Sequence, residues 1–428
     1  MKPKSLWQNQ TTLPCFDSLK SDVTTDVLII GGGLAGLLTA YKLTEKGVDC
    51  ILVEKNRICS STTANTTAKI TAQHGFVYNK ILKSYSEDYA KAYYIANKTA
   101  LENLTDLCTQ AKCKIEIKDN FVYSTDKYEI EKELEALQRI GIPAIYKEEV
   151  PLPFKVSGAV GFKNQAQFCV LELVKYISKN LRIYENTKVE EMIGTTAKTA
   201  KGKIKAKKVV VTTHFPFINK HGNYFLKLYQ HRSYIIALKN AVKLKEMYVD
   251  NDKKGLSFST FGDYLLLGGG GHRTGKQGGS FSELKKFETL HYPDSKEVFR
   301  WAAQDTISLD HIPYIGNYSK STPDLYVATG FNKWGMTSSM LAGEIIYSEI
   351  TGSPKPYAKI FYPSRRTLKP QLFANGFETL KNLATPTARR CPHLGCALKY
   401  NKAEHSWDCP CHGSRFDENG KILEGPAN

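Results

Sequence analysis

Residues 26–36 read DVLIIGGGLAG, and the architecture of the chain can be inferred outward from them. The first five form a continuous apolar run, as in a strand that is buried on both faces of a parallel sheet. Glycines follow at positions 31, 33 and 36, and a helix-forming segment continues to about residue 43. The pattern predicts a strand, a tight turn and a helix that belong to one βαβ unit.

The three glycines have separate roles in such a turn. Gly31 permits the sharp change of direction, Gly33 lets the backbone approach a pyrophosphate, and Gly36 allows close packing of helix and strand. A second apolar strand, residues 50–53, ends at Glu54, where a carboxylate can hold ribose hydroxyls. The unit therefore predicts a bound dinucleotide, and Glu54 argues against NADP. A tight βαβ turn without a ligand is the alternative.

Helices and strands alternate up to residue 352. From apolar periodicity and glycine turns, we expect helices over residues 126–140, 165–179 and 336–350. Strands are expected near residues 204–213, 234–238, 264–267 and 325–329. Prolines at positions 354, 356, 363 and 370 then indicate a linker with a short helix near 377–383.

Composition places the chain among soluble globular proteins. It has 428 residues, of which 42% are hydrophobic and 24% charged, and this length fits two or three domains. No apolar run approaches the ~18 residues that a membrane span needs. The N-terminal residues do not read as a secretion signal. We therefore expect a cytoplasmic protein without a transmembrane segment.

The net charge of +17 does not by itself indicate nucleic-acid binding. The densest basic cluster, residues 201–208, places Lys at alternate positions, which is typical of the solvated face of a β-hairpin strand. We therefore expect a Lys-rich surface and no nucleic-acid partner. An acidic carrier protein could still use that surface.

A second glycine-rich stretch, Gly270–Lys276, begins like a phosphate-binding loop. Gln277 stands where such a loop needs Ser or Thr to bind magnesium, and two glycines follow where a helix should begin. We expect a hairpin near the active site here, not a triphosphate site.

Several stretches together resemble the D-amino-acid-oxidase-like family of FAD enzymes. They are the first glycine turn, Thr212-Thr213 at the end of a strand, DHIPYIG at 310–316 and GFNKWGMT at 330–337. The resemblance implies an α/β fold with a glutathione-reductase-type FAD-binding Rossmann domain and an antiparallel β substrate subdomain. In that family the 330–337 stretch lies against the flavin ring, toward which the last helix points its positive N-terminal end.

The resemblance also implies which residues contact FAD. Val189 would hold the adenine end through its backbone, while a Thr-rich segment would contact the phosphates and the ring. The expected set is Gly31, Gly33, Gly36, Glu54, Lys55, Thr66, Thr67, Val189, Gly330, Gly335, Met336 and Thr337.

No catalytic side chain stands out, so the chemistry should belong to the cofactor. His74 is a weak candidate, because some relatives attach flavin covalently or approach the ring at its position. His272 and Arg273 are weak candidates in a loop that could face the ring. Arg232 and Arg273 could hold a substrate carboxylate, although no position in the sequence marks either as such.

The C-terminal end carries a metal-binding pattern. Cys391-Pro-His393 is followed by Cys409-Pro-Cys411-His412, so that two thiolates and two imidazoles could hold zinc. An additional pair, Cys396 and Cys411, lies close to these positions, and a bridge between them would tie the two loops together. This pair favours another kind of site.

The double motif closely resembles the Rieske [2Fe–2S] family. The resemblance implies that Cys391 and Cys409 bind one iron and that a disulfide joins Cys396 to Cys411. His393 and His412 would bind the other iron, and the imidazoles would raise the potential to roughly −150 to +300 mV.

We expect three parts: an FAD domain at 20–352, a linker at 353–390 and a shortened Rieske domain at 391–428. Only the linker precedes the first ligand loop, where Rieske domains usually have strands. We therefore expect the cluster segment to depend on the flavin domain for support.

Taken together, the resemblance implies an FAD/Rieske oxidoreductase. A small substrate of the amine or amino acid class would reduce FAD, and the cluster would pass the electrons to an external protein or quinone-like carrier. The alternative is an electron-transfer module for a protein partner, without an organic substrate. A zinc-bound tail on a simple oxidase is a remoter possibility.

Overall fold

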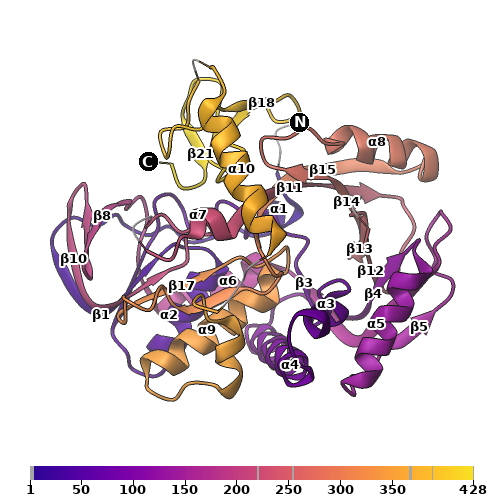
Figure 1. Cartoon of the computed structure of the whole chain (residues 1–428), viewed down its shortest axis with the longest axis horizontal. Helices are drawn as coiled ribbons and strands as arrows, with labels where there is room; N and C mark the ends of the chain where they lie inside the picture. The colour runs from indigo at the N-terminus through magenta and orange to yellow at the C-terminus, as the bar shows by residue number, and fades with distance from the viewer. Residues whose placement is uncertain (1–3, 219–220, 253–254, 366–368, 388, 428) are drawn as a thin grey trace.

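The computed structural model describes residues 4–218, 221–252, 255–365, 369–387 and 389–427. These residues form two large sheets, the helices that cover them, and a small third sheet near the C-terminus (Figure 1). No helix in these ranges is long and apolar enough to cross a membrane.

The first sheet leads into the glycine turn through β1, and it is the sheet that the sequence predicts to bind a nucleotide. Its order is β16-β17-β10-β1-β2-β7, parallel except at the β16 edge, with the β8–β9 hairpin beside β10. Its strands are β1 (Val23–Ile30), β2 (Cys50–Val53), β7 (Arg182–Tyr184), β8 (Val189–Ile193), β9 (Thr196–Thr199), β10 (Gly202–Val211), β16 (Tyr314–Asn317) and β17 (Leu325–Thr329).

Helices cover this sheet and explain its apolar strands. Val27 to Ile30 of β1 are all buried, as expected for a strand covered on both faces. α2 (Leu34–Glu45) packs on α9 (Gly335–Ile350), and α6 (Val170–Ile177) lies beside α2. At the α2–α9 crossing, a Cβ on Gly343 would lie 3.2 Å from the Leu38 carbonyl carbon, so the two helices meet closely.

The second sheet is mostly antiparallel, with the order β15-β11-β14-β13-β12-β4-β6-β3 and β5 beside β6. Only β12 and β4 run parallel. Its strands are β3 (Lys69–Ile70), β4 (Ile115–Ser124), β5 (Ile145–Lys147), β6 (Gly158–Phe168), β11 (Leu228–Lys239), β12 (Met247–Asp250), β13 (Ser257–Phe261), β14 (Tyr264–Arg273) and β15 (Lys296–Ser308). The predicted α/β fold with an antiparallel subdomain is confirmed.

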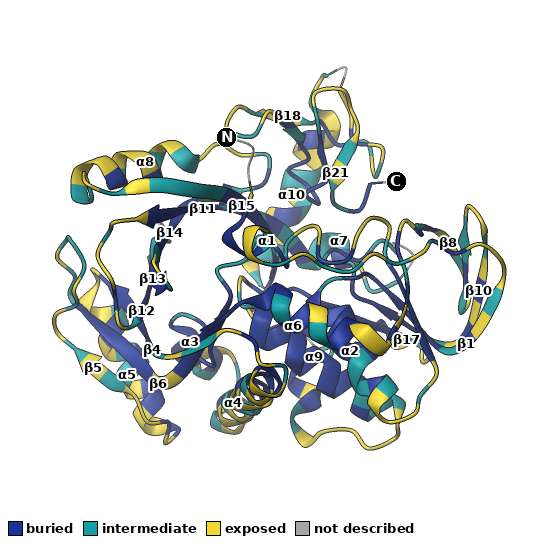
Figure 2. Cartoon of the chain, turned by 180° about the vertical axis from the view of Figure 1, so that it is seen from behind, coloured by how far each residue is buried: buried dark blue, intermediate teal, exposed yellow. Residues whose placement is uncertain are grey.

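The remaining helices lie around these sheets. Figure 2 shows that the central strands of both large sheets are buried, whereas α5 and α8 expose their outer faces. These elements are α1 (Leu6–Gln10), α3 (Val77–Ser84), α4 (Glu87–Gln110), α5 (Lys127–Arg139), η1 (Ser178–Asn180), α7 (Tyr224–Lys227), α8 (Ser280–His291), η2 (Pro356–Phe361) and α10 (Pro370–Ala384).

The C-terminal segment forms a small antiparallel sheet of short strands. The strands are β18 (Lys399–Asn401), β19 (Ser406–Asp408), β20 (Arg415–Phe416) and β21 (Ile422–Glu424), paired in sequence order. Figure 1 shows this segment in yellow above β11 and α7, with α10 running from beside it down toward the centre of the view.

Three local predictions can be compared with these elements. The helix expected at 126–140 is α5, and the Asp126 carboxylate caps it by accepting bonds from the N–H groups of Tyr128 and Glu129. The helix expected from residue 165 was placed too early, because Gln165 to Phe168 still pair with β4 as part of β6. The short helix expected near residues 377–383 of the linker belongs to α10, which is longer than predicted. The predicted boundaries between the FAD domain, the linker and the Rieske domain stay predictions.

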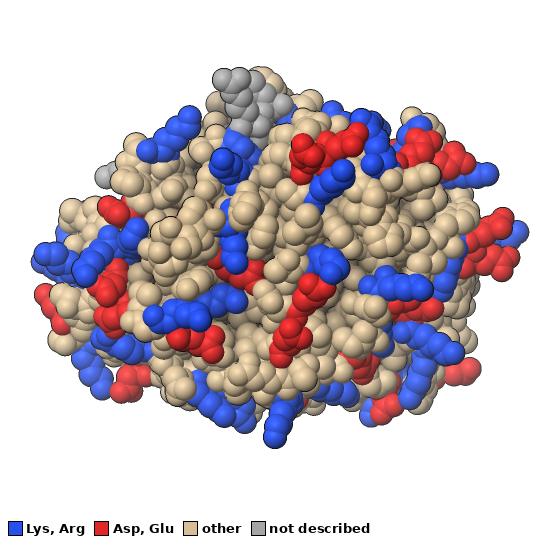
Figure 3. All heavy atoms as spheres, turned by 90° about the horizontal axis from the view of Figure 1, so that it is seen from below, with Lys and Arg blue, Asp and Glu red and all other residues tan. Residues whose placement is uncertain are grey.

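The charged surface also follows the sequence pattern. Lys203, Lys205 and Lys207 are exposed on β10, while the residues between them are more buried, as predicted for a solvated hairpin face. Figure 3 shows Lys and Arg interspersed with Asp and Glu over the lower face of the molecule.

Candidate functional site: a nucleotide cavity beside a Cys/His centre

The glycine turn has the geometry that its spacing requires. Gly31 has a φ of +116°, and a Cβ there would lie 2.7 Å from the Thr212 carbonyl oxygen. A Cβ on Gly36 would lie 2.0 Å from the Gly31 carbonyl oxygen, so only glycine fits. Gly33 caps α2, and a Cβ there would meet only the Thr63 hydroxyl, at 3.5 Å. Gly33 therefore faces open space at a helix N-terminus, where a phosphate binds well.

A cavity begins at this turn. Glu54, Lys55 and the 187–189 segment, which includes Val189, line it after β2 and β7, and Gly330, Gly335 and Met336 line it near the N-terminus of α9. The cavity thus joins the carboxyl ends of the parallel strands to the N-terminus of α9, and open α/β sheets bind ligands at such strand ends. Its lining fits a dinucleotide cofactor.

Glu54 is more constrained than the sequence suggested. One carboxylate oxygen accepts the Gly32 N–H at 2.8 Å, and the other accepts the Asn56 N–H at 2.9 Å. The carboxylate therefore also braces the glycine turn. Lys55 donates to the Gly425 carbonyl oxygen at 3.4 Å, which connects this end of the cavity to the C-terminal segment.

Some expected contact residues do not line the cavity. Thr66 and Thr67 lie outside it; the Thr66 hydroxyl accepts the Ala68 N–H, and the Thr67 hydroxyl accepts a bond from Lys69. Thr337 bonds to the backbone of Thr71 instead. Thr62 and Thr63, earlier in the same Thr-rich segment, form that part of the wall.

His74 does not face the cavity. Its Nδ1 lies 2.7 Å from the Tyr93 hydroxyl and its Nε2 lies 2.8 Å from the Thr71 carbonyl oxygen, so both nitrogens have partners. Its ring stacks on Trp334 at a centroid distance of 5.0 Å, and burial lowers the pKa of His74 to about 3. These contacts describe a structural histidine.

The other candidates from the sequence lie toward the C-terminal segment. His272 contacts the Tyr234 hydroxyl at 2.9 Å. Arg273 lies over the Tyr229 ring and donates to Asn375 of α10 at 3.1 Å. The glycine-rich stretch that ends β14 packs there too, since a Cβ on Gly275 would lie 2.7 Å from Pro410. That close contact explains why position 275, in the stretch that resembles a phosphate-binding loop, is a glycine.

The Cys/His motifs form two adjoining loops. A disulfide joins Cys396 to Cys411. The Cys391 thiol hydrogen-bonds to that of Cys409, which lowers the pKa of Cys391 to about 7. The rings of His393 and His412 lie 5.0 Å apart. Backbone bonds close both loops, with the Gly395 N–H on the Cys391 carbonyl and the Gly413 N–H on the Cys409 carbonyl.

The two imidazoles are in the form that binds metal. Burial lowers the pKa of His393 to about 4 and that of His412 to about 3, so both are neutral near pH 7. His412 is 1% exposed, and neither of its ring nitrogens makes a hydrogen bond of normal geometry to the described residues. A buried imidazole without such partners fits a metal ligand. The donor set, two thiols and two imidazoles, fits a [2Fe–2S] cluster.

The imidazole side of this centre faces the first sheet, at the end of β10. Phe215, which follows β10, lies with its ring centroid 5.5 Å from His412 and 6.5 Å from His393. The same Phe215 lines the nucleotide cavity, as do residues 423–427 of the C-terminal segment. The cavity and the Cys/His centre therefore share a wall, and the sequence did not identify Phe215 as part of it.

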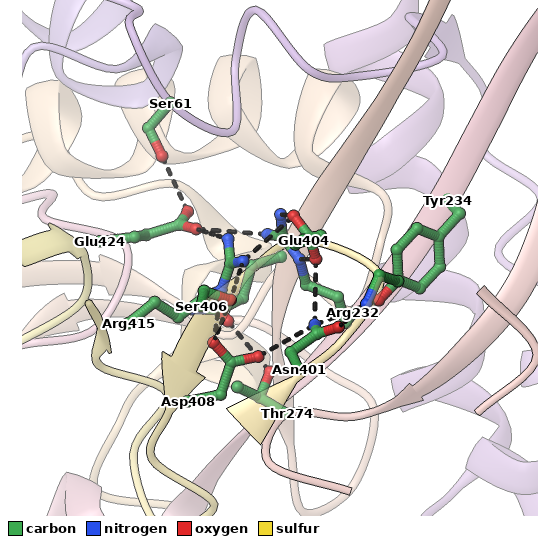
Figure 4. Close-up of polar contacts among 12 residues, drawn as sticks. Ser61, Arg232, Tyr234, Thr274, Asn401, Glu404, Ser406, Asp408, Arg415 and Glu424 are labelled. Atoms are coloured by element: carbon green, nitrogen blue, oxygen red, sulfur yellow. Dashed lines mark hydrogen bonds and ion pairs between the residues drawn. The ribbon is translucent and has the colours of Figure 1, made fainter. Parts of the chain in front are cut away.

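Buried ion pairs fix the C-terminal segment on the second sheet (Figure 4). Arg232 of β11 donates to Glu404 at 2.7 Å and pairs with Glu424 at 3.3 Å. Arg415 pairs with Glu404 and with Asp408, each at 3.0 Å. Arg232 is therefore used for docking and is not free to hold a substrate. The expectation that the cluster segment depends on the flavin domain for support agrees with these contacts.

A further group of titratable residues was missed in the sequence. Lys333 has a φ of +72° within the 330–337 loop. Lys333 is exposed, but desolvation of its ammonium group lowers its pKa, although nearby Asp305 opposes the shift. His231 and Asp305 are opposite each other on β11 and β15, and burial lowers the pKa of His231 to about 3, helped by Lys333. The one signal in the sequence for this group is the unusual pair Asn332-Lys333, two residues after Gly330.

Comparison with known proteins agrees with this geometry. Residues 26–348 match the FAD dependent oxidoreductase family, and residues 381–428 match the Rieske [2Fe-2S] domain. The Bacillus subtilis (strain 168) protein YhfW, described as a Rieske 2Fe-2S iron-sulfur protein, is 33% identical; the alignment covers 99% of this chain and 96% of that protein. The chain therefore belongs to the FAD-dependent oxidoreductase family and has a C-terminal Rieske domain, and it binds FAD and a [2Fe–2S] cluster.

Solved structures share the fold of the flavin domain. L-proline dehydrogenase from P. horikoshii superposes with a TM-score of 0.67 at 19% identity, covering 81% of this chain and 98% of that one. Glycine oxidase from Geobacillus kaustophilus gives a TM-score of 0.67 at 18% identity, covering 80% and 99%. At these identities the likeness establishes the fold alone.

Proposed function

We propose that this chain oxidises a small substrate of the amine or amino acid class and passes the electrons through its FAD and its cluster to an external acceptor. The observation that carries this proposal is the shared wall at Phe215, which contacts both imidazoles of the Cys/His centre and lines the nucleotide cavity. FAD supplies two-electron chemistry and the cluster supplies one-electron transfer.

The chain's own residues would hold FAD and the cluster in fixed positions, apart from each other. Gly31 and Gly33, at the N-terminus of α2, would bind the pyrophosphate through backbone N–H groups. Cys391 and Cys409 would bind one iron, and His393 and His412 the other. The Cys396–Cys411 disulfide would hold the two ligand loops together.

Lys333 is the cation that we assign to a substrate carboxylate. Arg232 and Arg273 are both engaged with the C-terminal part of the chain. Lys333 lies in the loop between two cavity-lining residues, Gly330 and Gly335, close to Asp305 and His231. A carboxylate bound there would form a charge-assisted hydrogen bond with the Lys333 ammonium group.

A Lys333→Met variant should therefore bind an amino acid substrate less well. We expect KM to rise by roughly 10- to 100-fold, the worth of a hydrogen bond to a charged group, with FAD content unchanged. Steady-state kinetics with the best amino acid and with the matching amine, which lacks the carboxylate, distinguishes this role. If KM for both changes equally, Lys333 does not bind the carboxylate.

A Gly33→Ala variant tests the pyrophosphate site. The added Cβ would lie 3.5 Å from the Thr63 hydroxyl, which is an ordinary contact within the protein, but it would occupy space that a bound pyrophosphate needs. We expect FAD affinity to fall by roughly tenfold or more, from lost hydrogen bonds to a charged group, with little change in the unfolding midpoint of the FAD-free protein. Flavin fluorescence on titration measures the affinity. Gly376→Ala, which adds a Cβ with nothing within 4 Å, is the control.

The decisive experiment is anaerobic reduction by a panel of amines, amino acids and hydroxy acids, with flavin and cluster spectra recorded together. The proposal requires that one substrate bleaches the flavin and that the cluster is then reduced. Flavin bleaching without cluster reduction would contradict the proposed electron path. No response to the panel, with partner reduction that depends steeply on salt, would favour an electron-transfer module.

A further inference from the structure

α10 (Pro370–Ala384) has its polar side facing the protein and its apolar side facing solvent. Phe373, Phe377 and Leu380 share one face of the helix, and they are 73%, 69% and 67% exposed. The side of α10 that faces the protein carries buried Asn375 and Asn382. A surface helix of a globular protein normally has the opposite arrangement.

Polar contacts hold α10 in this orientation. Asn375 donates to the Leu226 carbonyl oxygen at 3.0 Å and accepts a bond from Arg273. Glu378 pairs with Lys276 at 2.8 Å. The Asn382 carbonyl accepts the Ala397 N–H at 3.0 Å. Rotating the helix about its axis would break these contacts, so they keep its apolar face toward solvent. Exposed apolar patches of this kind mark interaction sites.

The apolar face extends toward the cluster. Leu383 and Leu394 are 39% and 41% exposed, and a Cβ on Gly395, in the first ligand loop, would lie 3.8 Å from Leu383. Arg390 donates to the carbonyl oxygens of both Leu383 and Gly395. Whatever binds the α10 face therefore sits beside the loop that carries Cys391 and His393.

The surrounding charge identifies the kind of surface that fits. Between residues 353 and 400 the sequence has nine basic residues and one acidic residue, Glu378, which pairs with Lys276. Lys381 is exposed in the last turn of α10, and Arg389 and Arg390 are exposed a few residues beyond its end. Bulky apolar side chains along one face of a helix, flanked by Lys and Arg, are typical of a helix that lies in the interface of an anionic membrane. A second copy of the chain would bring the same positive charge against itself.

We propose that the α10 face, defined as Phe373, Phe377, Leu380, Leu383 and Leu394, binds peripherally to an anionic lipid bilayer. The phenylalanine rings enter the acyl boundary, and the flanking basic side chains contact lipid phosphates. The first ligand loop is then held at the membrane surface, where a lipid-soluble acceptor would be within reach.

Vesicle co-sedimentation of the full holoprotein tests this proposal. We expect binding to vesicles that contain phosphatidylglycerol, much weaker binding to pure phosphatidylcholine, and release at high salt. The Phe373→Ser/Phe377→Ser double variant should lose affinity by roughly tenfold or more. Lys381→Gln should lose roughly fivefold. Leu290→Ser, which removes a 74% exposed leucine from α8, is the matched control and should bind normally.

Flavin and cluster absorbance should be unchanged in every variant, which separates lost binding from lost folding. Equal binding to both vesicle types, or binding that the double Phe variant retains, would overturn the proposal. So would a dimer that the double Phe variant dissociates in sedimentation velocity, because a second copy would then occupy the face. Binding to neither vesicle type would also overturn it. This holds even if an acidic carrier protein oxidises the cluster and that reaction depends on Phe377.

Discussion

A Cys409→Ser variant should lose the [2Fe–2S] cluster while keeping its FAD. Cys409 is 1% exposed, its thiol contacts that of Cys391, and its backbone closes the second ligand loop through bonds to Ser414 and Gly413. Changes to residues that merely support metal ligands already cost 10- to 100-fold in metal affinity or activity. Removing a thiolate ligand should cost roughly as much or more.

The measurement combines iron and acid-labile sulfide analysis, paramagnetic resonance of the reduced protein, and flavin content. We expect iron and sulfide to be lost, FAD to remain, and substrate to bleach the flavin without onward transfer to a one-electron acceptor. Cys15→Ser, which removes an exposed cysteine elsewhere, should leave both cofactors in place. Normal cluster content in Cys409→Ser would refute the ligand assignment, and zinc in the wild-type protein without sulfide would indicate a structural site instead.

Motifs that are local in sequence were predictable from residues alone. The roles of Gly31, Gly33 and Gly36 depend on a turn of a few residues, so spacing was enough to assign them. The Cys/His loops are similarly short, and each carries its two expected ligands. Lys55, which the family resemblance placed among the contact residues, lines the cavity.

Contacts between distant segments could not be read from the sequence. Arg232 looked like a free cation, but its partners, Glu404 and Glu424, are 172 and 192 residues away. His74 was a weak candidate because some relatives approach the flavin at its position, but its nitrogens are occupied by Tyr93 and Thr71. In each case tertiary packing decided which groups the side chain would meet.

The secondary-structure prediction was wrong where strand pairing competed with a helical spacing of apolar residues. Gln165 to Phe168 have apolar positions that suit the following helix, but β4 offers them backbone partners, and they extend β6 instead. The proline-rich linker was expected to be mostly irregular. Pro370 in fact occupies the first turn of α10, where a missing N–H costs nothing.

An Arg232→Met variant should destabilise the docking of the C-terminal segment by about 3–5 kcal/mol, the usual result of removing one partner of a buried ion pair. The Arg232 side chain is 5% exposed, and those of Glu404 and Glu424 are each 14% exposed. Without Arg232, two buried carboxylates share the single guanidinium of Arg415, which also serves Asp408. Arg182→Met, which breaks the half-exposed pair with Asp49, is the control and should cost less than about 1 kcal/mol.

The effect should depend on pH in a defined direction. Burial alone would raise the pKa of Glu404, but Arg232 and Arg415 outweigh it and hold this pKa at about 2, below the ordinary 4.5. Because the folded-state pKa is depressed, the stabilisation is complete above pH ~4.5 and is lost as the pH falls toward 2. The shift corresponds to about 3 kcal/mol from this group.

Without Arg232 the pKa of Glu404 should rise, so the variant should differ most from wild type at neutral pH and least in acid. Urea titrations at several pH values, followed by cluster absorbance and circular dichroism, measure that difference. A penalty that stays constant from neutral pH into acid would mean that Arg232 acts through packing and not through its charge. A penalty as small as that of Arg182→Met would mean that these ion pairs do not hold the cluster segment, and the rigid wall between the cavity and the Cys/His centre would then need another cause.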